Sequence, residues 1–136
     1  EYRARCVQPS AAAPAARYDI SGGAVYDRQT RLTWQQVIPT LRHTWADAQT
    51  YCSELSLGDG SGGDWRLPSI NELQTLVDDS TNPSIDLGAF PKTPSEYFWS
   101  SSAVIDDAAR AWTTFFTNGS TYSFAVTATK NVRCVR

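Results

Sequence analysis

The sequence predicts an α+β domain in which two helices pack on an antiparallel sheet beside a long loop region. Apolar residues at helical spacing occur in the middle of the chain, near residues 44–56 and 69–77. Short strand-like segments precede and follow these helices. Because helices and strands do not alternate along the chain, the pattern disfavours a parallel α/β sheet.

Length and charge limit the possible partners. The chain has 136 residues, enough for one domain with a substantial core. Its net charge of −2 gives no basic field that would gather nucleic acid or an anionic membrane surface. No apolar run approaches the roughly 18 residues that a membrane-spanning helix needs. Since Met is absent, we expect the chain to be a processed product or part of a longer one.

The N-terminal residues are expected to lie outside the domain. Residues 9–17 are interpreted as a Pro/Ala linker, and the domain proper covers residues 18–136. The triplet Arg5-Cys6-Val7 repeats Arg133-Cys134-Val135 near the chain end. Residues 1–8 are therefore interpreted as a possible terminal strand of a preceding copy of the domain.

The three cysteines, Cys6, Cys52 and Cys134, do not have the paired short spacing of a zinc site. Cys52 and Cys134 are the expected disulfide, which would stabilise the fold by about 4 to 5 kcal/mol in the chain-entropy model. Cys6 is then unpaired within the domain. It would pair with a cysteine of an adjacent copy or of another chain, or remain a free thiol.

A hairpin is predicted at the start of the domain. Residues 19–33 alternate apolar and polar side chains, with turn-forming residues at 27–30. Pro39 interrupts the segment that follows, so residues 35–42 are expected to form a connection.

The first helix is predicted to begin after Thr44, a favourable N-cap. Asp47 would lie near the positive end of the helix dipole. The helix should end near Ser56. Its inward face should contain Trp45, Ala48, Cys52 and Leu55.

A glycine-rich run, GDGSGG, follows at residues 58–63. It has neither the ending of a P-loop nor the ligand spacing of an EF-hand. We interpret it as a flexible loop, with Asp59 and Asp64 as the candidate calcium ligands. No other cofactor or metal site is expected.

The stretch from Gly63 to Leu73 joins this loop to the second helix. Proline fixes its own φ and disfavours helical backbone in the residue before it, so the helix should start after Pro68. The next residues have the spacing of a capping box. Asp64 and Arg66 are expected to form an ion pair that holds the loop to the fold, an interpretation preferred to a ligand site at these residues. Structural roles are therefore assigned to Asp64, Trp65, Arg66, Pro68, Ser69 and Glu72.

The C-terminal half is predicted to begin with an ordered loop over residues 78–97, anchored by Ile85, Leu87 and Phe90. Strands and a hairpin turn follow. The strands are predicted over residues 97–102, 111–116, 121–126 and 130–136, with the turn at Asn118-Gly119 and the last strand closing the sheet.

No catalytic site is predicted. His43 is the one histidine, and no nucleophile signature surrounds it. The acid pairs Asp78-Asp79 and Asp106-Asp107 could in principle serve a glycosidase, but adjacent acids in loops are usually solvated turn residues. The chain is therefore not expected to be an enzyme.

Eight short segments occur in a characteristic order. They are Val25–Trp34, Thr44–Ala48, Tyr51–Cys52, Asp64–Pro68, Asn71–Leu73, Tyr97–Ser101, Ala111–Trp112 and Val132–Arg136. Together they resemble the Lcl C-terminal-like family of bacterial domains, which includes the C-terminal domain of the Legionella collagen-like adhesin. The resemblance covers nearly all of residues 18–136, and it departs from the family's usual Gly at Arg31.

The resemblance implies a C-type-lectin-like fold with a disulfide from the first helix to the last strand. It also implies a secreted or cell-surface bacterial protein with a role in adhesion or glycan binding. The Glu-Pro-Asn and Gln-Pro-Asp motifs of calcium-dependent lectins do not occur, so that mode of sugar binding does not carry over. Nor does the sequence contain a cluster of Arg and Lys suited to sulfated glycosaminoglycans.

The leading hypothesis is a non-enzymatic extracellular recognition module that binds a glycan or a protein surface through its long loop and adjacent strand ends. An exposed aromatic ring can stack on a sugar while neighbouring polar groups orient it. The alternative is a structural repeat unit of a larger cell-surface or fibre protein, with adjacent copies as partners. An enzyme ranks third. The candidate ligand-binding residues are Tyr97, Asp106, Asp107, Arg110, Asn118 and Tyr122.

Overall fold

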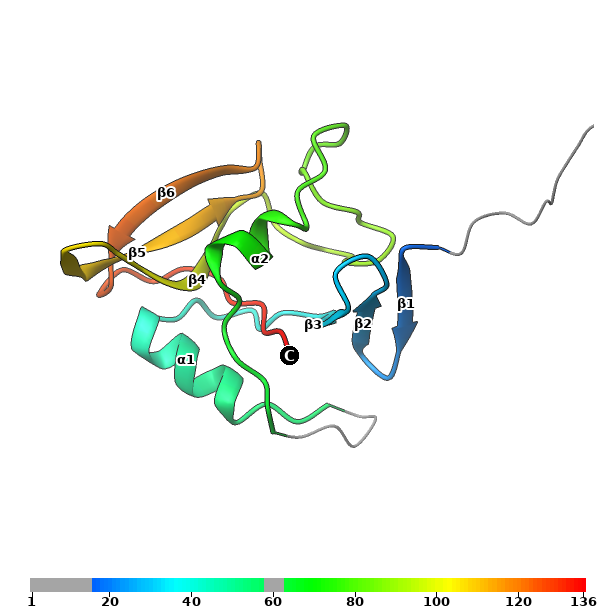
Figure 1. The fold of residues 1–136 in the computed structure, drawn as a ribbon, viewed down its shortest axis with the longest axis horizontal. Coiled ribbons are helices and arrows are strands. Elements are labelled where there is room, and N and C mark those ends of the chain that lie inside the picture. Colours follow the sequence, from blue (N-terminus) through cyan, green and yellow to red (C-terminus); the bar gives the residue numbers. More distant parts are fainter. Residues whose placement is uncertain (1–15, 58–62) are drawn as a thin grey trace, which may run out of the picture.

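A computed structural model describes residues 16–57 and 63–136 and confirms the α+β class (Figure 1). The described chain forms two three-stranded antiparallel sheets and two short helices, so the predicted single sheet is divided in two. Residues 1–8, most of the predicted linker and Asp59 lie outside the described ranges. The elements are β1 (Tyr18–Ser21), β2 (Ala24–Asp27), β3 (Leu32–Gln35), α1 (Trp45–Ser53), α2 (Ile70–Gln74), β4 (Tyr97–Val104), β5 (Asp107–Phe115) and β6 (Ser120–Ala125).

The first sheet, β1-β2-β3, contains the predicted hairpin and one additional strand. Gly22 and Gly23, with φ of 61° and 83°, reverse the chain between β1 and β2. Glycine adopts such backbone angles without steric cost, so this pair makes a turn of its own. The predicted turn lies between β2 and β3, at residues 28–31.

The turn between β2 and β3 is organised by Asp27, whose side chain is fully buried. Its carboxylate accepts hydrogen bonds from the Arg17 guanidinium at 2.8 and 3.0 Å, the Gln29 amide at 2.9 Å and the Thr30 hydroxyl at 2.9 Å. Burial alone would raise the pKa of Asp27, but these hydrogen bonds outweigh it and lower that pKa. Arg31 completes the turn in the left-handed region, with φ of 64°.

The second sheet, β4-β5-β6, confirms three of the predicted strands. β5 begins at Asp107, earlier than expected, because a tight turn with Asp106 at φ 64° joins it to β4. The Asn118-Gly119 turn is also confirmed, within a reversal that covers residues 116–119. Phe116 leaves the strand there and is buried in the core.

Both helices begin where their capping residues predict. The Thr44 hydroxyl accepts from the Asp47 amide at 3.3 Å, and α1 ends at Ser53 rather than near Ser56. In α2 the Ser69 hydroxyl accepts from the Glu72 amide at 3.1 Å, and the Glu72 carboxylate accepts from the Ser69 amide at 2.8 Å. The capping box is therefore complete.

The C-terminal segment, residues 130–136, does not close a sheet as predicted. It forms isolated bridges to both sheets instead, with Asn131 opposite Phe98 of β4 and Val135 opposite Trp34 of β3. In Figure 1 this red segment runs through the middle of the molecule. It joins the two sheets because each sheet leaves an edge residue free to pair with it.

The predicted disulfide is confirmed. Cys52 of α1 and Cys134 of the C-terminal segment are both fully buried, with a Cα–Cα distance of 5.5 Å. Their cluster also contains Ala48, as the helical spacing predicts, together with Trp65 and Trp99. The bond therefore attaches α1 to the segment that both sheets share.

Arg133 of the C-terminal segment is a buried cation. Its guanidinium donates to the carbonyls of Gln35 and Gln36 at 2.6 and 2.7 Å and to the Thr93 hydroxyl at 2.8 Å. The ring centroid of Phe90 lies 4.7 Å away. Burial lowers the pKa of Arg133 to about 9, so the group remains charged at neutral pH and fixes the chain that follows β3.

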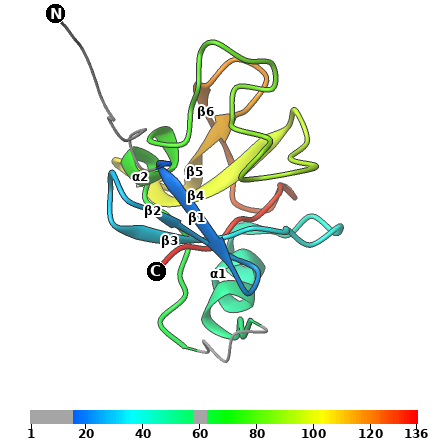
Figure 2. The ribbon, with the colours of Figure 1, turned by 90° about the vertical axis from the view of Figure 1, so that its right-hand side faces the viewer.

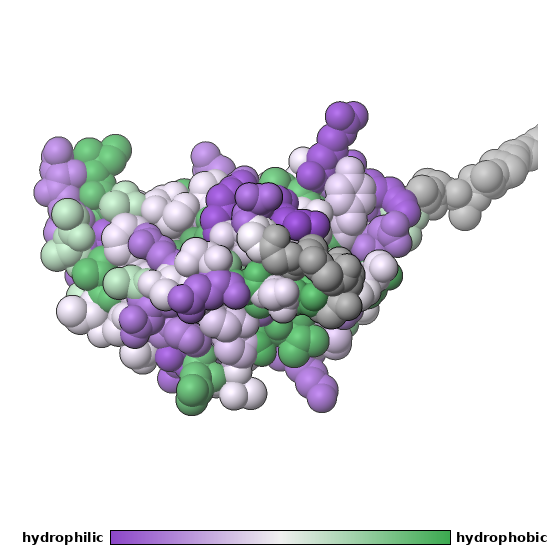
Figure 3. Space-filling model, turned by 90° about the horizontal axis from the view of Figure 1, so that it is seen from below, coloured by the Kyte–Doolittle hydropathy of each residue, from purple (hydrophilic) through white to green (hydrophobic). Residues whose placement is uncertain are grey.

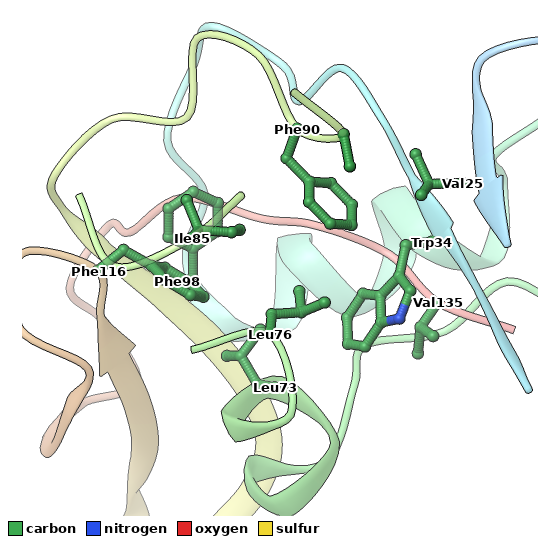
Figure 4. Close-up of a cluster of buried hydrophobic side chains, with 10 residues drawn as sticks. Val25, Trp34, Leu73, Leu76, Ile85, Phe90, Phe98, Phe116 and Val135 are labelled. Atoms are coloured by element: carbon green, nitrogen blue, oxygen red, sulfur yellow. The ribbon is translucent and has the colours of Figure 1, made fainter. Parts of the chain in front are cut away.

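A second hydrophobic cluster surrounds Trp34, which Figure 4 shows among Phe90, Val135 and their neighbours. Phe90 and Ile85 are fully buried, as predicted for anchors of the long loop. Leu87 is not an anchor, because its side chain is 45% exposed. The carboxylate of Asp86 accepts from the two amides after Leu87, at 2.8 and 3.3 Å, and turns the chain outward there.

Candidate functional site

Two of the predicted ligand-binding residues, Tyr97 and Tyr122, lie together on one face of the second sheet. The Tyr97 ring stacks on Phe115 with centroids 4.3 Å apart, and it meets Tyr122 edge-on at 5.8 Å. Phe124 contacts the same ring at 4.8 Å. We call the four residues Tyr97, Phe115, Tyr122 and Phe124 the aromatic edge.

Strand register produces the aromatic edge. Tyr97 pairs directly with Phe115 across β4 and β5. Tyr122 and Phe124 are two residues apart on β6, and successive side chains of a strand point to opposite faces. Those two rings therefore project on the same side, and the side chain of Tyr122 stays 43% exposed.

Lys130 places a cation against these rings. Its ammonium nitrogen lies 3.7 Å from the Phe124 centroid and 4.8 Å from that of Tyr97. Burial, followed by the nearby charge of Arg42, lowers the pKa of Lys130. A cation over an aromatic face is attracted by the negative potential of the ring, so the lysine and the rings hold one another in place.

Glu96 is the centre of a polar network beside the aromatic edge. Its carboxylate accepts from the Asn131 amide at 2.8 Å and from the Arg42 guanidinium at 2.8 Å. The hydrogen bond from Asn131 is the main cause of a lowered pKa of Glu96, against the effect of burial. With Tyr97, Phe115 and Lys130, this network lines a small open pocket of about 250 Å³.

A larger apolar groove adjoins this pocket. One wall is the segment 37–42 and the other is the segment 91–94, and the volume between them is about 980 Å³. In Figure 2 the segment 37–42, in cyan, projects from the body of the molecule. Both the groove and the pocket are lined by Arg42, Glu96, Thr129 and Asn131. The two sites therefore form one continuous surface.

The other predicted ligand-binding residues are not brought to this surface. Asp106 and Asp107 lie at the turn between β4 and β5, whereas Asn118 lies at the turn between β5 and β6. These turns are at opposite ends of the nine-residue strand β5, about 30 Å apart at 3.3 Å per residue. Arg110 projects on the face opposite to the aromatic edge and donates to Ser123.

The predicted ion pair between Asp64 and Arg66 is wrong. Arg66 instead forms two hydrogen bonds with the Glu72 carboxylate, at 2.7 and 2.9 Å, and these lower the pKa of Glu72. Asp64 has a φ of 66° and forms no salt bridge within the described residues. The partner of Arg66 is therefore the carboxylate that caps the start of α2.

The remaining structural assignments are placed as follows. Trp65 and Pro68 are buried. The Pro68 carbonyl accepts from the Ser101 amide of β4 at 2.7 Å, so the turn before α2 is attached to the second sheet.

On the face that carries α1, hydrophobic and hydrophilic side chains are interspersed (Figure 3), and no single apolar area stands out there.

Within the described ranges, no group of three or more His, Cys, Asp and Glu side chains is placed to hold a metal ion. The His43 ring lies 5.2 Å from the Tyr51 ring, and its buried Nδ1 has no hydrogen-bond partner in the described part of the chain. The described helices include none that is long and apolar enough to cross a membrane.

Sequence inspection missed most of the polar surface. Arg42, Glu96, Lys130 and Asn131 come from three separate segments, so no local pattern joins them. Phe124 could have been found, because it follows Tyr122 at the two-residue spacing of one strand face.

The family model described as Lcl C-terminal domain matches residues 23–136. This range contains β2, β3, both helices, the second sheet, the disulfide and the candidate surface, whereas β1 lies before it. No curated protein matches the chain.

Proposed function

The chain belongs to the Lcl C-terminal domain family, and on this premise we propose that it is a non-enzymatic recognition module of a secreted or surface-exposed bacterial protein. Its role would be adhesion. A C-type-lectin-like fold is part of the proposal. Two helices, antiparallel sheets and a disulfide from α1 to the C-terminal segment support that fold.

The ligand of this module is a carbohydrate that binds at the aromatic edge. The observation that carries the proposal is the exposed Tyr122 ring beside Tyr97, next to the polar network of Glu96, Lys130 and Asn131. A sugar ring presents an apolar face that stacks on an aromatic side chain. Its hydroxyl groups can bond to the carboxylate, ammonium and amide that surround the small pocket.

A glycan array, probed with the purified domain in calcium and then in chelator, tests this function. Tyr122→Ala should weaken binding to any glycan recognised by at least about tenfold, equivalent to about 1.4 kcal/mol. Tyr26→Ala is the matched control, because Tyr26 lies in the first sheet and is 39% exposed, close to the 43% of Tyr122. It should bind as the unaltered domain does.

The melting temperature of each variant separates recognition from folding. Replacing either exposed tyrosine by Ala should change the melting temperature by a few degrees at most. A blank array, or equal loss of binding in Tyr122→Ala and Tyr26→Ala, would contradict a carbohydrate site at the aromatic edge. Calcium dependence of the hits would point to the acidic loops instead.

A second candidate is a structural repeat unit in a longer surface or fibre protein. Each residue of the triplet Arg133-Cys134-Val135 has a distinct contact that completes the fold. The same triplet at Arg5-Cys6-Val7 therefore fits the end of an upstream copy. Mass spectrometry of the longer protein would test it, because Cys6 should be bonded to a helix cysteine of that copy. A free Cys6 thiol would contradict the repeat.

A further inference from the structure

The apolar groove between segments 37–42 and 91–94 is separate from the proposed carbohydrate site in its chemistry. Val37 and Leu41 are 68% and 74% exposed, higher than any other large hydrophobic side chain of the described chain except Ile105. Both line the groove, together with Pro39, Pro91 and Pro94. Exposed aliphatic side chains gathered around one concave surface mark an interaction site rather than scattered surface residues.

The backbone of the 37–42 wall has unused hydrogen-bonding capacity. The residues on either side of this segment do form backbone hydrogen bonds. The Gln36 amide donates to the Gly23 carbonyl, and His43 exchanges two hydrogen bonds with Lys130. Within the described chain, residues 37–42 form no backbone–backbone hydrogen bond. A ligand with its own main-chain donors and acceptors can therefore bond along this wall.

The opposite wall restricts how such a ligand lies. Pro91 and Pro94 have no backbone N–H, so this wall offers apolar contact and few donors. A polypeptide segment fits both walls, because its main chain can bond to residues 37–42 while its apolar side chains contact the prolines. A sugar would leave Val37 and Leu41 against hydroxyl groups.

Charge at the rim selects the flanking residues of that segment. Arg42, Lys92 and Glu96 are the charged side chains that line the groove. Glu96 is bonded to Arg42 and Asn131, whereas Lys92 has no salt bridge within the described residues. The rim therefore carries one net positive charge, and it favours a carboxylate on the ligand.

From these contacts we propose that the groove binds an extended segment of a partner protein, with apolar side chains against Val37 and Leu41 and an acidic residue beside Lys92. This activity is additional to carbohydrate binding at the aromatic edge. The two sites share Arg42, Glu96, Thr129 and Asn131, so a bound peptide would lie next to a bound sugar.

Two sets of short immobilised synthetic peptides test the proposal. Each peptide carries two Val or Leu residues, flanked by Asp or Glu in one set and by Lys in the other. The purified domain should prefer the acidic set by about tenfold at low salt, and less at high salt because exposed charges are screened. Equal binding to both sets, or no binding to either, would overturn the proposal.

Variants locate the binding on the groove. The double substitution Val37→Ser with Leu41→Ser should remove peptide binding and leave the glycan-array pattern unchanged, which separates this site from the aromatic edge. Lys92→Glu should reverse the preference between the two peptide sets. Ile105→Ser is the control, since Ile105 is 87% exposed at a distant turn. Peptide binding retained by the double variant, with its melting temperature unchanged, would overturn the proposal.

Sedimentation of the domain without peptide addresses a second copy as the occupant. A monomer at all concentrations leaves the groove free for a partner, as proposed. A dimer that the Val37→Ser and Leu41→Ser substitutions dissociate would assign the groove to self-association and overturn the proposal.

Discussion

Two turns of the molecule, one in each sheet, meet the same backbone requirement in opposite ways. In the second sheet, the turn between β5 and β6 has Gly119 at φ 78°, which glycine adopts freely. In the first sheet, the turn between β2 and β3 has Arg31 at φ 64°. A residue with a Cβ loses about 1 to 2 kcal/mol in this left-handed region.

The difference shows two ways to fix a turn. The turn between β2 and β3 is held by the buried Asp27 carboxylate and its four donors, which compensate for the unfavourable backbone of Arg31. The turn between β5 and β6 depends on shape, because Gly119 lies against Val77 with no room for a Cβ. One turn should therefore be sensitive to charge and the other to volume.

The largest effect should come from breaking the segment that both sheets share. Replacing Cys52 and Cys134 by Ala removes a crosslink across 82 positions of sequence, which contributes about 4 to 5 kcal/mol to the free energy of unfolding. Urea unfolding should show this loss. The unaltered protein in reductant should lose a similar amount, and full stability of the double variant would show that the crosslink is unimportant.

Asp27→Asn tests the charged turn and should lower the free energy of unfolding by about 2 to 4 kcal/mol, because the Arg17 guanidinium loses its buried partner. Asp19→Asn is the control. Asp19 forms an exposed ion pair with Arg28 at 3.3 Å, and such pairs contribute little.

The same variant should change the dependence of stability on pH. The pKa of Asp27 is lowered in the folded state, so its contribution is present above its ordinary pKa, near 4, and is lost as the pH falls through the lowered value. The free energy of unfolding, measured with urea between neutral and acidic pH, should therefore change less with pH for Asp27→Asn. Parallel curves for the variant and the unaltered protein would contradict the role of the carboxylate.

Gly119→Ala tests the shape-dependent turn and should destabilise by about 2 to 3 kcal/mol, from its backbone angle and from overpacking. A Cβ there would lie 2.5 Å from Cγ1 of Val77. Gly23→Ala is the control, because Gly23 has a φ of 83° but nothing within 4 Å of the added Cβ. Gly23→Ala should lose only the part of the free energy of unfolding that comes from the unfavourable backbone angle. Equal losses in thermal melts would show that Val77 yields without cost.

The smallest effect should be a gain. Arg31→Gly should stabilise by roughly 0.5 to 1 kcal/mol, since relief of the left-handed backbone exceeds the added entropy of the unfolded chain. Arg28→Gly, in the same turn, has no positive φ to relieve and should not stabilise. A lower melting temperature for Arg31→Gly would mean that the arginine side chain contributes more than its backbone angle costs.

Sequence alone predicted the parts of the fold that neighbouring residues specify. Thr44, and Ser69 with Glu72, marked both helix starts because capping involves residues three apart. Cys52 on the inward face of a predicted helix, with Cys134 on the predicted last strand, indicated the disulfide. The partner of Arg66 was missed because two acids lie near it in sequence and only the folded turn selects Glu72 over Asp64.

The candidate surface was predicted in part for the same reason. Tyr97 and Tyr122 were identified as residues, but their meeting depends on the register across β5, which no local signal fixes. Asp106 has a left-handed φ and lies in the turn between β4 and β5, away from the aromatic edge. The contribution of Lys130 requires a C-terminal segment that crosses between sheets, a path that strand propensity does not encode.

That crossing segment has a consequence for the order of events during synthesis. Residues 130–136 supply Arg133, Cys134 and Val135, and they leave the ribosome after every helix and strand of the domain. Until then, Cys52 lacks its disulfide partner Cys134, and the carbonyls of Gln35 and Gln36 lack the guanidinium of Arg133. The disulfide and the hydrogen bonds of Arg133 can therefore form only after synthesis has reached these residues, and a chain interrupted just before residue 130 would contain every helix and strand without the segment that joins the two sheets.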